Sequence, residues 1–254
     1  MQRVLPLIFL FSLMSLTGGI GLVQAEPPSE EYKLVWADEF DGTELDTSKW
    51  GYHGLGPRRD AINVKEGVTL KDGFLYITTT KVGDEYHTAI IDTQGKYEPT
   101  FGYFETRVKF QDQLGHWSAF WLNSPTISGV GDVRKYGTEI DIFEYLVKDK
   151  DTIHMNLHWD GYGDDHKTTG SKYTGEGISE GFHIIGLEWT PEEYVFYVDG
   201  KEVWRTSEAV SHRGEYILLS MEVGDWALDI KDAQLPDSVT FDYVRVYQKQ
   251  SEIK

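Results

Sequence analysis

The chain has no cysteine among its 254 residues. This absence excludes disulfide bonds, thiolate metal sites and a cysteine nucleophile. Amphipathic helical periodicity is also nearly absent, and only residues 207–210 suggest a single helical turn. Without disulfides, the protein must be held together by its own core, which favours one large fold over several small domains.

Basic residues are scarce as well, with 24 Lys and Arg against 42 Asp and Glu and a formal net charge of −18. This balance makes nucleic acid a poor partner, because binding phosphates requires a basic face. It also disfavours a densely sulfated polymer, although a local basic patch could override the global charge. Aromatic residues make up 14% of the chain, with eight tryptophans, which suits stacking on the faces of neutral sugars.

The N-terminus reads Met1-Gln2-Arg3, continues as a long apolar stretch and reaches Val23-Gln24-Ala25. This pattern predicts a signal peptide over residues 1–25, cleaved near Ala25, and therefore a secreted or periplasmic protein. A membrane anchor is the alternative, but the strictly apolar run is short for a span. No other segment is apolar enough to cross a bilayer.

The sequence after residue 25 predicts one domain. Residues 26–31 are a polar lead-in that we expect to be mobile, and residues 32–250 form the single domain, which we expect to be monomeric. Short β-rich runs alternate with turn residues, including Asp72-Gly73 and Asp199-Gly200, each of which predicts a hairpin between two strands. The pattern predicts an all-β sandwich of two antiparallel sheets, with residues 160–178 as a long polar loop at the rim of a site.

One strand carries the strongest chemical signal. Residues 138–145 read Thr-Glu-Ile-Asp-Ile-Phe-Glu-Tyr, so three carboxylates interrupt an otherwise apolar, β-favouring segment. Glu139 and Asp141 share a strand face, whereas Glu144 has the opposite parity. A β-bulge near Ile142 or Phe143 would bring Glu144 to the same face. Three acids together would be costly in a dry core, and the sequence predicts that they line a wet groove.

Paired carboxylates at such a place suit glycoside hydrolysis. A retaining glycosidase needs two carboxyl groups about 5–5.5 Å apart, one as nucleophile and one as acid/base. No phosphate-binding loop, zinc-protease motif, nucleophile elbow or dinucleotide fingerprint competes with this interpretation.

The segment Glu139-Ile-Asp-Ile-Phe-Glu144 resembles the bulged E-x-D-x-x-E signature of glycoside hydrolase family 16. Further segments at 35–42, 102–110, 117–122, 182–191 and 241–247 resemble strands of this family in the same order. The resemblance implies a β-jelly-roll with a concave cleft that cleaves internal β-1,3- or β-1,4-linkages of glucans or galactans with retention. It also implies Glu139 as nucleophile, Asp141 as the assisting acid and Glu144 as acid/base, with no cofactor required.

Binding residues follow less directly from the resemblance. Trp117 and Trp121 have the same parity, and Trp117 is favoured as a sugar platform over a role in the core. His158 is expected in the cleft, with a buried structural role as the alternative. Trp226 resembles a late cleft tryptophan. The early loop offers Arg58, Arg59 and Asn63 as substrate contacts or as solvated loop residues.

Two further acids, Glu39 and Asp242, resemble a structural calcium site far from the cleft, or are simple surface acids.

Two departures from the family pattern concern the substrate. Trp117-Ser-Ala stands where laminarinase-like members usually have Trp-Pro-Ala, and His158-Trp-Asp-Gly stands where they tend to have His-Thr-Trp-Gly. Both weaken a β-1,3-glucanase assignment and leave galactans open. A non-catalytic carbohydrate-binding jelly roll and a transglycosylase remain the alternative functions.

Overall fold

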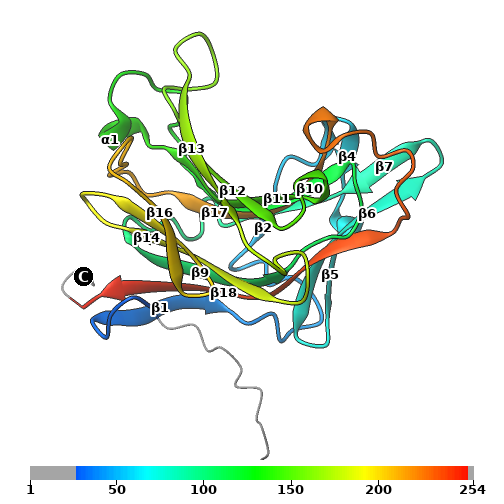
Figure 1. Cartoon of the computed structure of the whole chain (residues 1–254), viewed down its shortest axis with the longest axis horizontal. Helices are drawn as coiled ribbons and strands as arrows, with labels where there is room; N and C mark the ends of the chain where they lie inside the picture. The colour runs from blue at the N-terminus through cyan, green and yellow to red at the C-terminus, as the bar shows by residue number, and fades with distance from the viewer. Residues whose placement is uncertain (1–26, 251–254) are drawn as a thin grey trace, which may run out of the picture.

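Two largely antiparallel sheets, stacked face to face, form the body of the protein. The computed structural model describes residues 27–250. Figure 1 shows the layer of β14, β9, β18 and β1 beneath the layer of β12, β11, β10 and β17. This arrangement confirms the predicted β-sandwich and its jelly-roll form. Within the described residues no helix is long and apolar enough to cross a membrane.

The larger sheet has eleven strands in the order β16-β15-β14-β9-β18-β6-β7-β4-β3, with β1 also paired to β18 and β5 to β6. Its strands are β1 (Tyr32–Asp38), β3 (Gly56–Arg58), β4 (Ala61–Asn63), β5 (Val68–Lys71), β6 (Phe74–Val82), β7 (Glu85–Thr88), β9 (Gly102–Lys109), β14 (His183–Trp189), β15 (Tyr194–Val198), β16 (Lys201–Thr206) and β18 (Asp237–Lys249).

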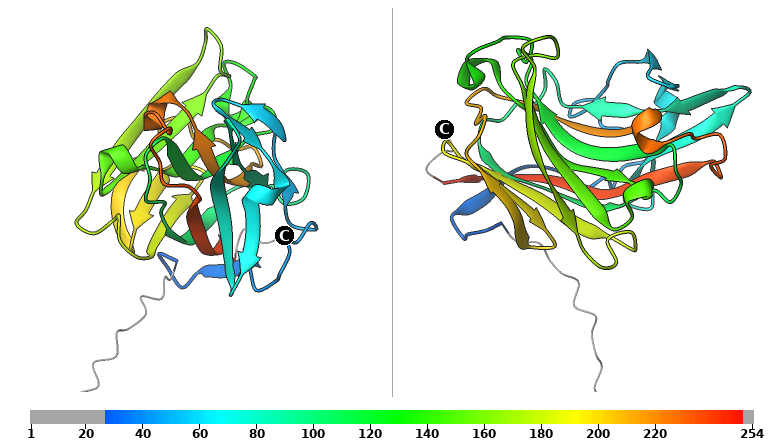
Figure 2. Two further views of the ribbon diagram at one scale, coloured as in Figure 1. Left: turned by 90° about the vertical axis from the view of Figure 1, so that its right-hand side faces the viewer. Right: turned by 45° about the horizontal axis from the view of Figure 1, so that its top comes forward.

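The second sheet has seven strands in the order β13-β12-β11-β10-β17-β8-β2 and curves over the first, as the two views of Figure 2 show. Its strands are β2 (Gly51–Tyr52), β8 (Ile90–Asp92), β10 (His116–Asn123), β11 (Glu139–Leu146), β12 (Thr152–Trp159), β13 (Lys167–Thr174) and β17 (Tyr216–Val223). The described helices are one short α-helix, α1 (Val133–Tyr136), and the 3₁₀ turns η1 (Lys65–Gly67), η2 (Val147–Asp149) and η3 (Asp225–Ala227).

The two predicted hairpins are confirmed. Lys71 pairs with Phe74 across Asp72 and Gly73, whose φ angles of 55° and 79° are the positive values that a type I′ turn requires. Asp199 and Gly200 join β15 to β16 with φ angles of 50° and 76°. Residues 207–210 form no helix, and residues 208 and 209 lie in a turn.

The prediction of an uninterrupted polar loop over residues 160–178 is wrong in part, because β13 runs from Lys167 to Thr174 and pairs with β12 along its whole length. This strand ends the seven-stranded sheet, so one edge and one face meet water and its side chains can be polar. Threonines at 168, 169 and 174 supply the β-branched residues that favour a strand.

A continuous apolar core lies between the sheets and fixes the orientation of the carboxylate strand. Ile140, Ile142 and Phe143 on β11 are fully buried in this core, together with Phe104 on β9 and Phe120 on β10. Since one face of β11 is committed to the core, its acidic side chains are directed to the opposite, concave face of the seven-stranded sheet.

A β-bulge in β11 brings the third acid to that concave face. Opposite β10, Phe143 pairs with Phe120 and Asp141 with Trp121, so Ile142 has no partner there. The register against β12 shifts over the same residues. The extra residue reverses the parity of the strand after Asp141 and confirms the bulge that the sequence predicts.

Candidate active site

The concave face carries a cavity of about 420 Å³. Its lining comes from β10, β11 and β17, from Arg58 at the end of β3, and from the loops that carry Arg59 and Tyr162. All three carboxylates of β11 reach it: Glu139, Asp141 and Glu144. The strand alternation and the bulge together therefore place the three acids in one open groove.

Burial dominates the electrostatics of the three acids. It raises the pKa of Glu139, while hydrogen bonding from Tyr162 and the nearby His158 act in the opposite direction. The pKa of Asp141 is raised well above its usual range by burial and then by the charges of Glu139 and Glu222. Burial, followed by the charge of Asp141, likewise raises the pKa of Glu144. The groove therefore favours keeping some of these protons on, as a site with an acid catalyst requires.

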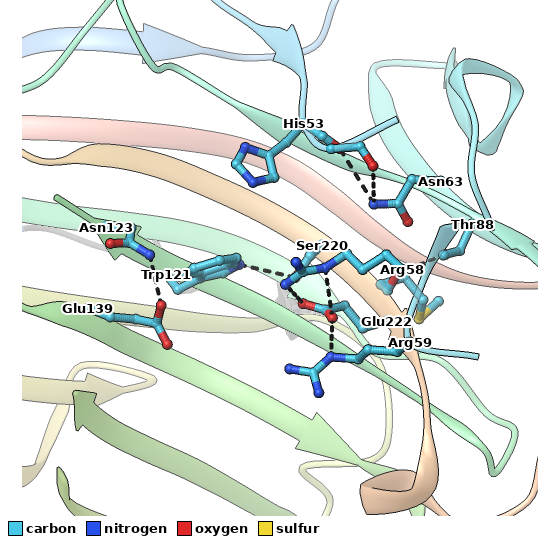
Figure 3. Close-up of polar contacts among 12 residues, drawn as sticks. His53, Arg58, Arg59, Asn63, Thr88, Trp121, Asn123, Glu139, Ser220 and Glu222 are labelled. Atoms are coloured by element: carbon cyan, nitrogen blue, oxygen red, sulfur yellow. Dashed lines mark hydrogen bonds and ion pairs between the residues drawn. The ribbon is translucent and has the colours of Figure 1, made fainter. Parts of the chain in front are cut away.

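Each acid has its own polar partner. Asn123 Nδ2 donates a 2.8 Å hydrogen bond to Glu139 Oε2, a contact drawn in Figure 3. Asn156 Nδ2 donates a 2.8 Å hydrogen bond to Glu144 Oε2. His158 Nε2 lies 3.3 Å from Asp141 Oδ2. These contacts give the three carboxylates different surroundings and so allow them different roles.

His158 also contacts a second imidazole. Its Nδ1 lies 3.0 Å from His166 Nε2, and the two rings stack with centroids 5.1 Å apart. His158 therefore contacts Asp141, although it is not itself among the residues that line the cavity.

The two tryptophans of β10 line the cavity together. Trp121 donates through Nε1 to Ser220 Oγ at 3.1 Å, and Figure 3 shows this contact across to β17. Trp117 lies under the guanidinium of Arg59, whose central carbon is 5.2 Å from the ring centroid. Trp226 is not among the residues that line the cavity; it packs edge-on against Trp117 with centroids 5.4 Å apart and is 39% exposed.

Arg58 and Arg59 both bind Glu222 at the cavity wall, as Figure 3 shows. Arg58 donates from Nε and Nη2 at 3.1 and 2.9 Å, and Arg59 donates from Nε at 2.6 Å. Asn63 is buried and is not among the residues that line the cavity, and its amide donates to the backbone carbonyls of His53 and Gly54. In this arrangement Asn63 shapes the loop and does not face the cavity.

The suggested calcium ligands lie elsewhere, each paired with an arginine. Both oxygens of Glu39 accept hydrogen bonds from Arg245, at 2.8 and 2.7 Å. Asp242 accepts a hydrogen bond from Arg107 at 2.5 Å. Two carboxylates neutralised by separate guanidinium groups do not fit a shared calcium site. The calcium prediction therefore has no support in the geometry.

The only group of potential metal ligands found in residues 27–250 lies in the groove itself: oxygens of Glu139 and Asp141 and a ring nitrogen of His158 fall within 4.8 Å of one another. A divalent cation held there would occupy the carboxylate oxygens that glycoside chemistry needs. We therefore treat the three residues as part of a hydrolytic site.

Several cavity residues were not predicted from the sequence. Three residues of β17 line the cavity, Tyr216, Ser220 and Glu222, and they share one parity, so the parity argument used for β11 could have found them. Asn123 continues the alternation of Trp117 and Trp121 on β10. Tyr162 lies in the polar segment that the sequence predicts at the rim of a site, but no pattern distinguishes this tyrosine from the other residues of the segment.

Comparison with known proteins identifies the family of the chain. The family model described as "Beta-porphyranase A-D, GH16 domain" matches residues 33–249. A β-glucanase of Rhodothermus marinus is 29% identical, with 85% of each chain covered. β-Porphyranase B of Zobellia galactanivorans is 28% identical, with 87% of this chain and 86% of that protein covered.

Among solved structures, the catalytic domain of an endo-1,3-β-glucanase from Thermotoga petrophila superposes with a TM-score of 0.75 at 29% identity. The match covers 86% of this chain and 98% of that one. Several other curated relatives are longer, and the chain spans 35% to 60% of their length. With a family match over nearly all described residues, the chain belongs to glycoside hydrolase family 16 and is an endo-acting β-glycan hydrolase.

Proposed function

We propose that this protein is an exported, retaining endo-β-glycanase that cleaves internal linkages of a β-linked galactan. The observation that carries the proposal is the bulged strand β11, which directs Glu139, Asp141 and Glu144 into one cavity. Export rests on the leader over residues 1–25, which lies outside the described residues. N-terminal sequencing of the secreted protein should then begin at Glu26.

The reaction proceeds by double displacement. Glu139 attacks the anomeric carbon while the glycosidic C–O bond breaks and Glu144 gives its proton to the departing oxygen. The raised pKa of Glu144, caused first by burial and then by the charge of Asp141, suits a group that must hold a proton before the first step. Glu144 then removes a proton from water, and this water cleaves the glycosyl-enzyme ester.

The galactan assignment rests on two observations. The family model that matches this chain carries the description of β-porphyranases. The stretch Trp117-Ser-Ala differs from the Trp-Pro-Ala that laminarinase-like members usually have. Within galactans, the net charge of −18 favours regions with little or no sulfate. Arg58 and Arg59 offset that charge only in part, because both are bound to Glu222.

The test compares Glu139→Gln with the wild-type enzyme and with Glu192→Gln, a control at an exposed glutamate on the loop between β14 and β15. Reducing ends are measured on laminarin, mixed-linkage glucan, β-1,3-galactan, agarose, porphyran and carrageenan. We expect Glu139→Gln to fold and to lose essentially all hydrolysis, because an amide cannot form the ester. Retention of more than a few per cent of activity would contradict the assigned role.

Two further readouts decide between alternatives. The first product should carry the β configuration by proton NMR, and an inverted product would end the double-displacement mechanism. Faster cleavage of laminarin than of every galactan would overturn the galactan assignment. Products longer than the starting oligosaccharide, without new reducing ends, would indicate a transglycosylase.

A further inference from the structure

One side chain in the cavity has no role in the mechanism above. Tyr162, from the connection between β12 and β13, directs its hydroxyl to Glu139 and donates a hydrogen bond to Oε2. Tyr162 is 57% exposed, so its side chain extends into the groove from the rim. A side chain from a surface loop thus contacts the proposed nucleophile directly.

The hydrogen bonds on Glu139 distinguish its two oxygens. Asn123 Nδ2 donates to the same Oε2 at 2.8 Å and also donates to the hydroxyl of Tyr162 at 2.9 Å. Asn123 and Tyr162 thus form a closed triangle with this one oxygen. Within residues 27–250, no hydrogen bond is found to Oε1 of Glu139. Oε2 is therefore restrained, and Oε1 is available for attack.

Tyr162 is well suited to remain a donor. Burial of its hydroxyl, and then the charge of Glu139, raise the pKa of Tyr162 and keep it protonated. In return, this hydrogen bond counteracts the rise in the pKa of Glu139 that burial causes. A hydrogen bond to the charged form favours that form, and a nucleophile must be ionised before it can attack.

The loop that carries Tyr162 is anchored on both sides. Asp160 Oδ1 accepts a 2.8 Å hydrogen bond from the backbone N–H of Gly131, and Oδ2 accepts one of 2.7 Å from Lys167 Nζ. Gly161 follows with a φ of 74°, in the left-handed region that favours glycine. These contacts fix the direction in which the chain leaves β12 and so place Tyr162 over the nucleophile.

We propose that Tyr162 is a positioning residue that, together with Asn123, holds Glu139 by Oε2 and presents Oε1 to the anomeric carbon. This proposal rests on the proposed role of Glu139 as nucleophile. In the first step an electron pair of Oε1 forms the new C–O bond, and Oε2 becomes the carbonyl oxygen of the ester. In the second step the ester bond breaks, its electron pair returns to the carboxylate, and the Tyr162 hydroxyl stabilises the returning charge without transferring its proton.

The test is Tyr162→Phe, which keeps the ring and removes only the donor. The matched control is Tyr76→Phe on β6 of the other sheet, whose hydroxyl has no hydrogen-bond partner found within the described residues. We expect kcat on the preferred polysaccharide to fall about 10- to 100-fold in Tyr162→Phe, the usual effect of losing a hydrogen bond to a charged group. Tyr76→Phe should match the wild-type enzyme.

Two measurements separate positioning from a merely structural effect. The acidic limb of the kcat/KM profile should move to higher pH in Tyr162→Phe, because Glu139 loses a bond that favours its ionised form. The glycosyl-enzyme should also accumulate in rapid-quench samples analysed by intact mass, because the second step loses more stabilisation than the first. Tyr162→Ala should show the same shift of the acidic limb.

An unchanged acidic limb with no accumulated intermediate, in a preparation where Glu139→Gln is inactive, would overturn the role of Tyr162 and leave the proposed function intact. An active Glu139→Gln enzyme would instead remove the nucleophile on which both proposals depend.

Discussion

Trp117 and Glu222 lie directly opposite each other on β10 and β17. Arg59 joins them: its Nε donates to Glu222 at 2.6 Å, and its guanidinium lies over the ring of Trp117. The side chain of Glu222 is only 7% exposed, and its ion pairs with Arg58 and Arg59 neutralise its charge. Glu222 therefore controls both the charge of this cavity wall and the position of the arginine that covers the sugar-platform candidate.

Glu222→Gln should change substrate preference more than it changes the chemical step. Removing this carboxylate leaves Arg58 and Arg59 without their shared counter-charge, so the groove becomes more positive. We expect the ratio of kcat/KM on a sulfated galactan to kcat/KM on its desulfated form to rise about 2- to 10-fold at low salt. The gain should shrink as salt is added, because salt screens exposed charges. An unchanged ratio at both salt concentrations would show that Glu222 has no part in selecting substrate charge.

Glu144→Ala should fail mainly where the leaving group needs a proton. General acid catalysis contributes about 10²- to 10⁴-fold, so cleavage of natural linkages should fall by that order. An activated aryl glycoside of the same repeat should retain much of its first-step rate. Added azide should then give a glycosyl azide with the β configuration, and an α-configured product would contradict the roles given to Glu139 and Glu144.

Asp141→Asn should lower activity less than a change at either glutamate. After burial, the charge of Asp141 is the next cause that raises the pKa of Glu144. Removing it should lower the pKa of the acid and move the basic limb of the pH profile down by about one unit. Because the acids titrate as a group, the profile reports the whole site. A wild-type rate and profile would place Asp141 outside the working site.

Much of the site follows from the period of the strands. The alternation along β11, with one bulge at Ile142, was sufficient to predict that Glu139, Asp141 and Glu144 share a face, because the apolar residues between them had to face a core. The hairpins at Asp72-Gly73 and Asp199-Gly200 follow from local turn chemistry.

Other features depend on contacts between distant parts of the chain. Tyr162 reaches Glu139 because Asp160 is bound to Gly131, about thirty positions earlier, and no local pattern records that contact. The sequence does not reveal that Glu39 and Asp242 are paired with Arg245 and Arg107, because these pairs form only when β9 and the residue after β1 lie beside β18. Asn63 was assigned to substrate because sequence cannot distinguish a loop amide facing solvent from one bound to its own backbone.

A buried acid outside the cavity provides a prediction about stability. Glu215 is fully buried just before β17, and its Oε1 accepts a 2.9 Å hydrogen bond from the backbone N–H of Thr138, the residue before Glu139. Burial raises the pKa of Glu215 from its usual 4.5 to about 8. The folded state therefore binds this proton more tightly than the unfolded chain does. The stability that Glu215 contributes is present below about pH 4.5 and is lost as the pH rises towards 8.

Glu215→Gln keeps an oxygen that can accept from Thr138 and removes the titration. Between pH 5 and pH 8.5, the free energy of unfolding should fall less in the variant than in the wild-type protein. The two falls should differ by up to about 4 kcal/mol, since one pKa unit corresponds to about 1.4 kcal/mol. Urea unfolding at the two pH values measures this, with Glu192→Gln as the control. Glu139, Asp141 and Glu144 add a trend of the same sign to every variant, so only the difference from wild type is informative. A pH dependence equal to that of the wild-type protein would mean that Glu215 titrates alike in the folded and unfolded states.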